Sequence, residues 1–312
     1  MKAVKYSKFG GVDVLDVVDN AEKPAIGEGQ VLVEVEAVSI NPIDFKIRLG
    51  YMKDFMPVKF PVTIGSDFAG IVKEIHGGNS QFRKGDKVFG NAIVLNGGSG
   101  SFSEFVAANV ANTAFAPKTI DLQKAAAFPL AGASAIQAIE DGIKLQKGQK
   151  ILIHGGAGGI GIIAIQLAKL IGAEVATTVS ERDMSFVKEL GADTVLDYHK
   201  GDFDTVLSNY DAVLDLVGGD TLTKSYAVLK KGGVLVTLTG RPDEELAKKI
   251  GITAMGQMTA TDTKHLNRVA ELVDKKAMKI NVDKVFTINQ SREAFTHAEQ
   301  KHPRGKVVLT MK

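Results

Sequence analysis

The chain has 312 residues, with 38 Lys plus Arg against 36 Asp plus Glu, 45% hydrophobic residues and no cysteine. A net charge of +2 gives no excess of basic residues of the kind that nucleic-acid-binding and membrane-surface proteins carry, so we expect neither partner. Without cysteine, disulfides, thiolate zinc sites and a cysteine nucleophile are excluded. The length and apolar content allow one large or two ordinary domains, and we expect two.

The beginning of the chain, residues 1–6, runs into a strand-like alternation and lacks the apolar stretch of a secretory signal. The most apolar window, residues 160–168, contains Gly161 and Gln166 and ends before Lys169. It is far shorter than the roughly 18 apolar residues that cross a bilayer. We therefore expect a soluble cytoplasmic protein.

The first third of the chain alternates as half-buried strands do. In residues 31–36, valine occupies every second position and the glutamates fall on the opposite face. Further short strands are expected at residues 68–75, 87–89 and 102–107. Residues 41–46 predict one helix, with Asn41 as N-cap and Pro42 at the first helical position. A β-rich domain over residues 1–121 follows.

From residue 122, apolar strands alternate with helix-length amphipathic segments. The expected strands are residues 150–154, 174–179, 194–196, 212–216 and 234–239. The expected helices are residues 160–171, 183–190 and 222–229, with Gly172, Gly191 and Gly232 just past their ends as C-caps. This alternation predicts an α/β domain over residues 122–278, with a doubly wound parallel sheet.

Residues after Lys275 return to short strands, at 285–288 and 306–310, around a helix at 291–300. We expect residues 279–312 to pack back onto the first domain.

The strongest motif is a glycine-rich turn between a strand and a helix, with Gly156, Gly158 and Gly161 in the spacing GxGxxG. The first glycine permits a tight turn, the second lets a pyrophosphate approach the backbone, and the third lets the helix pack on the strand. The pyrophosphate then lies against the N–H groups of the helix start, which includes Gly159 and Ile160. Alone the pattern is weak, because any glycine-rich loop could show it. The complete strand–helix–strand context predicts dinucleotide binding.

The choice of cofactor depends on residues about 20 positions further on, where an acid would bind the ribose of NAD. Ser180, Glu181 and Arg182 stand there. A hydroxyl and a guanidinium favour the 2′-phosphate of NADPH. Two alternatives remain open: Ser180 only caps the helix that follows, or Glu181 turns inward and reverses the preference to NADH.

At this point the whole chain resembles the medium-chain dehydrogenase/reductase superfamily, in its zinc-independent quinone oxidoreductase (zeta-crystallin-like) branch. The segments that carry the resemblance, besides the glycine loop, are NPID (41–44), GSDFAG (65–70), KGDKVFG (84–90), AAAFPLAG (125–132), DLVGG (215–219) and GKVV (305–308). Residues 41–50 and 180–182 look most like the NADPH-dependent alkenal and enone reductases, in which a lysine is common where Arg182 stands here. The resemblance implies a GroES-like catalytic domain beside a Rossmann domain.

The resemblance also implies roles for particular residues. Lys46, Ser180, Arg182 and Tyr198 would contact NADPH, with Tyr198 near the adenosine phosphate. The residues expected near the nicotinamide are Ser134, where a threonine is usual, Val217 and Thr239. Two further candidates are Asn41, which could orient substrate or ribose or serve only as a cap, and Arg304, which precedes a segment expected to approach the cofactor or is only an exposed charge of a loop.

Zinc-dependent members of the superfamily hold their metal with Cys and His, whereas this chain has Asn41 and Ser66 at those positions. We therefore expect no metal, and without a Lewis acid alcohol oxidation loses a large stabilising contribution. Quinones and α,β-unsaturated ketones or aldehydes are already electron-poor and can accept hydride at carbon. Candidate proton donors are Lys46 and Tyr51, with solvent as the alternative.

The prediction is an NADPH-dependent quinone or enone reductase whose substrate enters between the domains. A metal-free enoyl-thioester reductase, and a nucleotide-binding protein without turnover of the crystallin or RNA-binding kind, are the alternatives. The resemblance further implies a homodimer that pairs through the sheet edge near residues 234–239 and 250–258.

Overall fold

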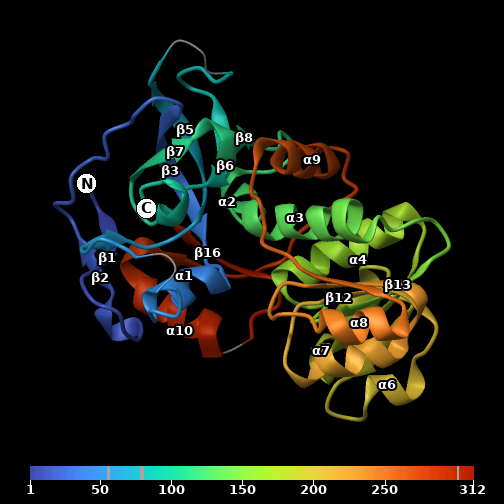
Figure 1. Ribbon diagram of the computed structural model, residues 1–312. Helices are drawn as coiled ribbons and strands as arrows, with labels where there is room; N and C mark the ends of the chain where they lie inside the picture. The colour runs from blue at the N-terminus through green and yellow to red at the C-terminus, as the bar shows by residue number, and fades with distance from the viewer. Residues whose placement is uncertain (55–56, 78–80, 301) are drawn as a thin grey trace. The chain divides into compact units, whose positions relative to one another are not determined.

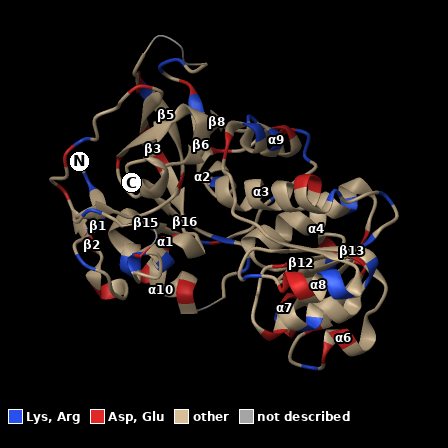
Figure 2. Ribbon diagram, viewed as in Figure 1, with Lys and Arg blue, Asp and Glu red and all other residues tan. Residues whose placement is uncertain are grey.

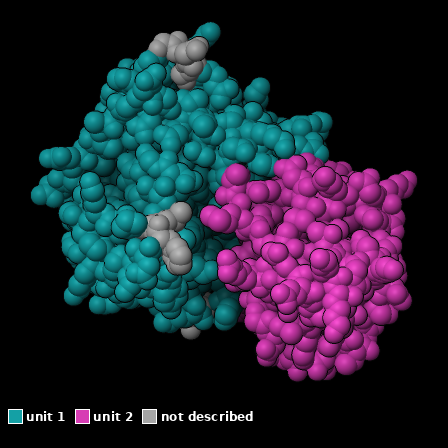
Figure 3. Space-filling model, viewed as in Figure 1, with its two compact units in different colours: residues 1–133, 261–276, 280–312 teal, residues 134–260, 277–279 magenta. Residues whose placement is uncertain are grey.

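Residues 1–54, 57–77, 81–300 and 302–312 are described by the computed structural model, which separates the chain into two units (Figure 3). Unit 1 comprises Met1–Ala133, Thr261–Lys276 and Ile280–Lys312, and unit 2 comprises Ser134–Ala260 and Ala277–Lys279. This division differs from the predicted one, because residues 122–133 and the helix α9 (Thr263–Asp274) belong to unit 1. Gly132 explains part of the difference: a Cβ there would lie 2.6 Å from a methyl of Val269 in α9, so the two segments are in close contact.

Unit 1 contains a seven-stranded sheet in the order β15-β16-β3-β5-β6-β8, with β7 paired to β3. These strands are β3 (Gln30–Ser39), β5 (Asp67–Ile75), β6 (Lys87–Asn91), β7 (Phe105–Asn109), β8 (Thr113–Phe115), β15 (Val282–Thr287) and β16 (Lys306–Thr310). A smaller antiparallel sheet joins β1 (Ala3–Tyr6), β2 (Asp16–Val18) and β4 (Val62–Thr63). Phe68, Phe102 and Phe295 are fully buried in the core of this unit.

The predicted strand at 102–107 is wrong at its beginning, because Phe102 belongs to a connection between the sheets. The Phe102 N–H donates to the Ile64 carbonyl and its own carbonyl accepts from Val4 N–H. At the C-terminal end of the chain, β16 pairs with β3, and Ile280–Lys312 belong to unit 1.

The first helix, α1 (Pro42–Arg48), begins with the expected cap. Asn41 is the N-cap: its N–H donates to Asp44 Oδ2 at 2.8 Å, its carbonyl accepts from the Asp44 N–H at 3.0 Å, and Pro42 occupies the first turn. At its other end the buried Arg48 guanidinium pairs with Glu299 of α10 (Ser291–Gln300), with Nη2 2.9 Å from Oε1. The helix is thus fixed at both ends.

Unit 2 is built on a six-stranded parallel sheet in the order β11-β10-β9-β12-β13-β14. The strands are β9 (Lys150–His154), β10 (Glu174–Val179), β11 (Thr194–Asp197), β12 (Tyr210–Asp215), β13 (Leu229–Thr237) and β14 (Thr253–Gly256). This is the Rossmann order, whose direction reverses at β9 and β12. The predicted α/β fold with a doubly wound parallel sheet and a second, β-rich unit is confirmed.

Helices cover both faces of the sheet of unit 2. Figure 1 shows α7 (Asp220–Ser225) and α8 (Glu244–Ile250) on one side of β12 and β13, and α4 (Gly159–Ile171) on the other. The remaining helices of this sheet are α5 (Met184–Glu189) and α6 (Phe203–Val206). Figure 2 shows both acidic and basic residues on α7 and α8; in each helix the acidic residues stand in the first turn and the lysines in the last.

Several expected elements end elsewhere. The helix expected over 222–229 ends at Ser225, and Gly232, expected as its C-cap, lies within β13 at a φ of 81°. Segments without a prediction form α2 (Leu122–Ala125), α3 (Pro129–Ile136), a π-helix (Gln137–Ile143), α8 and α9. None of the helices in the described part of the chain combines the length and the hydropathy that crossing a membrane requires.

Candidate functional site

The glycine loop after β9 has two glycines that the protein itself requires. A Cβ at Gly156 would lie 2.1 Å from the Thr177 hydroxyl oxygen, and one at Gly161 would lie 2.3 Å from the Gly155 carbonyl oxygen. Neither distance is possible, so the strand, the turn and the helix can pack only around glycine.

Gly158 differs from both, because a Cβ there would meet only the Gly155 carbonyl oxygen, at an ordinary 3.4 Å. It is the N-cap of α4, and residues 157–160 are partly exposed while Gly156 and Gly161 are buried. The N–H groups of the first turn, from Gly159 to Gly161, have no partners within the helix. Exposed backbone at the positive end of a 13-residue helix fits a pyrophosphate, so this loop fits the dinucleotide that the spacing predicts.

His154, which ends β9, is part of the core beneath the loop. Its Nδ1 lies 2.9 Å from the Thr178 hydroxyl and its Nε2 3.0 Å from the Ser225 hydroxyl. Burial lowers the pKa of His154 to about 4, so the imidazole is neutral at physiological pH.

Ser180 and Arg182 meet at the carboxyl end of β10 through one carboxylate. The Ser180 hydroxyl donates to Asp183 Oδ2 at 2.9 Å, and Arg182 Nε donates to the same oxygen at 3.3 Å. Asp183 is buried, whereas the Arg182 side chain is 58% exposed. Ser180 is the N-cap of a short 3-10 helix, Glu181–Asp183, but its hydroxyl makes no cap hydrogen bond to the backbone. Ser180 therefore occupies the N-cap position, but its hydroxyl does not cap the helix.

Tyr198 lies next to this group, at the end of the neighbouring strand β11. Its N–H donates to the Val179 carbonyl, and its ring is 58% exposed, stacked at a tilt on His199 with 4.1 Å between ring centroids. Glu181, the residue that left the cofactor choice open, pairs with Lys200, with 2.8 Å from Oε1 to Nζ. Lys200 was not among the predicted site residues, because nothing in its local sequence shows that it meets Glu181.

Asp215, at the end of β12, organises two residues expected near the nicotinamide. Its fully buried carboxylate accepts from the N–H groups of Val217 and Gly218 at 3.1 and 2.9 Å. Its second oxygen accepts from the hydroxyls of Thr237 and Thr239 at 2.6 and 3.2 Å. Val217 is 54% exposed, so its side chain extends from a loop whose backbone Asp215 fixes. The position of Asp215 at the end of an apolar strand, before Leu-Val-Gly-Gly, is a signal that could have identified it as a site residue.

Ser134 is buried at the beginning of unit 2. Its hydroxyl lies 2.7 Å from the Thr259 hydroxyl, and its carbonyl accepts from Gln257 Nε2 at 3.0 Å. The hydroxyl and the carbonyl of Ser134, which was predicted to lie near the nicotinamide, thus both have partners within the protein.

In unit 1, α1 and the turn that follows it carry the two candidate proton donors. Lys46 lies in the helix and is half-buried; its carbonyl accepts from the N–H of Tyr51 at 3.0 Å. The Tyr51 side chain is 71% exposed. Arg304 also lies in unit 1, before β16, where its N–H donates to Asp283 and its carbonyl accepts from Asn281.

The two positions that correspond to metal ligands in zinc-dependent relatives form a buried polar cluster here. Asn41 Nδ2 donates to Ser66 Oγ at 3.0 Å and to Asp67 Oδ2 at 2.7 Å, while Asn41 Oδ1 accepts from Lys306 Nζ. Lys306 Nζ also donates to the Ile40 carbonyl at 2.7 Å and lies 3.8 Å from Asp67 Oδ2. Burial raises the pKa of Asp67 and lowers that of Lys306.

These residues do not fit zinc, because the two positions offer an amide and a hydroxyl, and the carboxylate of Asp67 already accepts from Asn41 and lies beside the ammonium group of Lys306. Within the described residues, no group of three or more His, Cys, Asp or Glu side chains is placed to hold a metal ion. Lys306 was not predicted, since its partners lie at the other end of the sequence.

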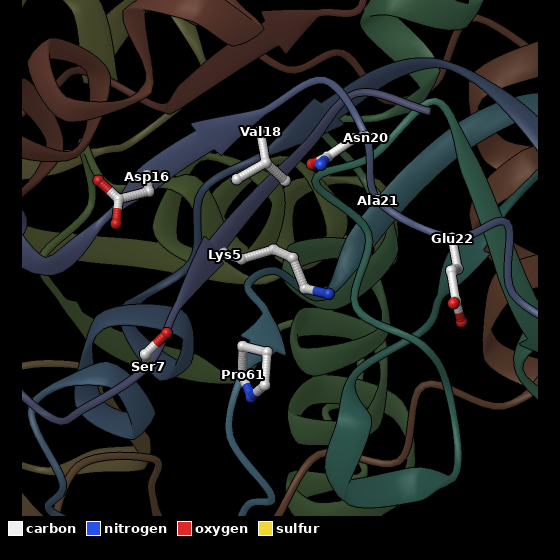
Figure 4. A pocket seen from close by; sticks show the side chains of 8 residues that line it. All are labelled: Lys5, Ser7, Asp16, Val18, Asn20, Ala21, Glu22 and Pro61. Atoms are coloured by element: carbon white, nitrogen blue, oxygen red, sulfur yellow. The ribbon is translucent and has the colours of Figure 1, made fainter.

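A cavity of about 390 Å³ opens on the small sheet of unit 1 (Figure 4) and contains none of the predicted site residues. Its lining residues are Lys5, Ser7, Asp16, Val18, Asn20, Ala21, Glu22 and Pro61.

Comparison with known proteins shows which family the chain resembles. A family model described as alcohol dehydrogenase GroES-like domain matches residues 27–118, and one described as zinc-binding dehydrogenase matches residues 190–309.

Two plant proteins are similar over 99% of this chain and 79% of their own length. They are the 2-methylene-furan-3-one reductase of Solanum lycopersicum, 35% identical, and the NADPH-dependent alkenal/one oxidoreductase of Arabidopsis thaliana, which is chloroplastic and 34% identical.

Among solved structures, the quinone oxidoreductase of Coxiella burnetii superposes with a TM-score of 0.91 at 33% identity, over 100% of this chain and 99% of its own. A mycobacterial protein solved with NADPH superposes with a TM-score of 0.88 at 28% identity, over 99% of each chain. The chain therefore belongs to the medium-chain dehydrogenase/reductase superfamily, in its zinc-independent branch of quinone and enone reductases.

Proposed function

We propose that this protein is an NADPH-dependent oxidoreductase that reduces quinones or the C=C bond of α,β-unsaturated ketones and aldehydes. The observation that carries the proposal is the glycine loop, in which Gly158, where a Cβ would make only an ordinary contact, lies at the partly exposed N-terminus of α4. The similarity to an NADPH-dependent alkenal/one oxidoreductase and to a quinone oxidoreductase supports the substrate class.

The residues of unit 2 would hold the cofactor at three places. Gly158, Gly159 and Ile160 would bind the pyrophosphate, Ser180, Arg182 and Tyr198 the adenosine end, and the Val217 loop with Thr239 the nicotinamide end. Asp215 would fix the distance between the Val217 loop and Thr239, because its carboxylate accepts hydrogen bonds from both. When bound, NADPH would supply a hydride.

The chain's own groups must then orient the acceptor and deliver a proton. Hydride addition to an enone places negative charge on the carbonyl oxygen, and a positioned donor stabilises that charge. Lys46 and Tyr51 are the candidates in unit 1, since both belong to the segment that α1 fixes. No zinc ion contributes in this proposal, because the cluster at Asn41 and Ser66 does not fit a metal. No cysteine contributes either, because the chain has none.

Steady-state kinetics tests the proposal with 1,4-naphthoquinone and a 2-alkenal, each under NADPH and NADH. Turnover of at least one acceptor with a higher kcat/KM for NADPH is expected. No turnover of either acceptor, or a clear preference for NADH, would refute it. Lys46→Met and Tyr51→Phe, compared with Lys53→Met as a control, then separate a protein proton donor from solvent. Removal of a side chain that donates the proton should lower kcat about 100-fold or more.

We also propose a homodimer that pairs along β14, which is the edge of the sheet of unit 2 and lies within the predicted segment 250–258. Residues 234–239 do not form this edge, because β13 is paired on both sides. The cytoplasmic location stays a prediction, which fractionation of the source cells would check.

A further inference from the structure

Glu181 and Lys200 form an exposed ion pair at the corner of the sheet where β10 and β11 end. Their charged atoms are 2.8 Å apart, and the side chains are 71% and 62% exposed. Strand pairing places Val179 opposite Asp197, so the two segments that follow, 180–182 and 198–200, are neighbours. Lys200 therefore lies in the same corner as Ser180 and Arg182.

Each cation of this corner already has an anionic partner. Arg182 pairs with Asp183, and Lys200 pairs with Glu181 at 2.8 Å and lies 3.9 Å from Asp197 Oδ2. The side chains of Asp183 and Asp197 are only 6% and 5% exposed, and both are held by further hydrogen bonds. Glu181 is the exposed carboxylate of the set, so it can leave its partner at the least cost.

Exposed ion pairs contribute little to stability because water and salt screen them. A phosphate dianion carries more charge than a carboxylate and has three acceptor oxygens. It would therefore replace Glu181 as the partner of Lys200 without loss of a strong interaction. A ribose hydroxyl has no charge, so it interacts with the Lys200 ammonium group more weakly than the Glu181 carboxylate does and would not replace it.

We propose that Lys200 is a specificity-determining residue for the 2′-phosphate of NADPH, and that Glu181 holds it in position until the phosphate replaces the carboxylate. The inference rests on the proposed function and concerns this chain's own pair. It also resolves the opposite roles open to Glu181: its carboxylate is directed to Lys200, so it competes with the phosphate instead of binding the ribose of NADH.

Binding of nucleotide fragments to the full chain tests the proposal without turnover. Adenosine 2′,5′-bisphosphate and 5′-AMP differ only in the 2′-phosphate, and calorimetry gives the Kd of each. Lys200→Gln should weaken the bisphosphate about tenfold and leave 5′-AMP unchanged, because one charged hydrogen bond is lost. Glu181→Gln should lower the Kd of the bisphosphate about threefold and leave the Kd of 5′-AMP unchanged. The same substitution should lower the Kd of the bisphosphate less when Lys200 is also replaced by Gln.

Lys230→Gln is the matched control, since Lys230 is an exposed lysine of unit 2 that pairs with Asp211 near the amino ends of β12 and β13. It should alter neither Kd. Thermal unfolding of each variant establishes that the chain is folded, as expected for exposed side chains.

The outcomes separate the two proposals. Wild-type protein that binds both fragments equally, or neither, overturns both the NADPH assignment and this inference. Wild-type protein that prefers the bisphosphate, with the same preference in Lys200→Gln, overturns only the role of Lys200. Weaker 5′-AMP binding in Glu181→Gln would show that Glu181 binds the ribose and would also overturn the inference.

Discussion

Two glycines of the loop after β9 serve different purposes, and alanine substitutions separate them. Gly161→Ala places a Cβ 2.3 Å from the Gly155 carbonyl oxygen, so the backbone must shift, and we expect a loss of about 1–3 kcal/mol in the free energy of unfolding. Gly158→Ala meets no such obstacle and should keep its stability within about 0.5 kcal/mol. It should nevertheless bind NADPH at least about tenfold more weakly, because its Cβ lies where the pyrophosphate approaches.

Urea unfolding and calorimetric titration with NADPH, applied to both variants, measure the two effects. If Gly158→Ala bound NADPH as wild type does, the assignment of this loop to the pyrophosphate would be wrong.

Asp44 makes the stability of the protein depend on pH. Burial raises the pKa of this carboxyl from 3.8 to about 7. Between those values the folded protein keeps a proton that the unfolded chain has lost, so the free energy of unfolding falls as pH rises, and it levels off above about pH 7. Asp44→Asn keeps an acceptor for the Asn41 N–H and removes the titration. From pH 5 to pH 8, the wild type should lose on the order of 2 kcal/mol more than the variant.

Chemical unfolding at a series of pH values gives the two curves. Parallel curves would show that Asp44 does not hold a proton in the folded protein.

The residues that could be predicted from the sequence are those whose signal is local. The glycine loop is one, because turn, phosphate approach and helix packing impose a fixed spacing within a few residues. Lys306 is the opposite case: it meets Asn41 from 265 positions away, and only the pairing of β16 with β3 brings them together. Lys200 was missed for a similar reason, since its distance to Glu181 depends on the register of β10 and β11.

At the level of elements, the sequence predicted strands and helices well where caps and periodicity agree. Helix α1 and α10 have the predicted positions, and β9, β10 and β16 match the expected ranges. Helix α9 was missed although Asp262 caps it, with a hydrogen bond from His265 N–H. Its place in unit 1 depends on packing between distant segments, which a local pattern does not contain.

The strand β16, which pairs with β15 and β3, begins at a buried charge, the ammonium group of Lys306. Lys306→Met would leave Asp67 without a counter-charge, although Asp67 still accepts from Ser39, Asn41, Asn91 and the Leu130 N–H. Because an unpaired buried charge is costly, we expect a loss of about 3–5 kcal/mol in the free energy of unfolding. Replacing Asp67 by Asn as well should restore part of it.

The control for this variant is Lys87→Met, which changes an exposed lysine on β6 of the same sheet and should cost no more than about 0.5 kcal/mol. Hydrogen exchange should show the β16 amides losing protection in Lys306→Met. Equal stability of the two variants would mean that Lys306 contributes no counter-charge.

For the whole molecule, the order of the strands in unit 2 follows from repeated strand–helix units, which the sequence displays directly. The division of the chain does not, because α9 and residues 122–133 join unit 1 through packing. The sequence pattern therefore predicted the fold class correctly, but its domain boundaries differ from the boundaries of the two units.

The edge strand β14 leads to the last prediction, on the oligomeric state. An edge strand presents unpaired backbone groups, and here it is followed by Met258, which is 82% exposed. Pairing with a second copy would satisfy the backbone and cover the methionine. We expect a particle of about twice the 33.2 kDa of one chain.

Met258→Glu would bury a charge in that interface and should raise the dimer dissociation constant at least about tenfold. Val206→Glu, at an exposed residue of α6 that does not belong to this edge, should leave the dimer intact. Light scattering over a range of concentrations measures both, and a wild-type particle of 33.2 kDa at micromolar concentration would contradict the dimer. Because the glycine loop and Lys200 belong to unit 2 of a single chain, the monomeric variant should still bind NADPH.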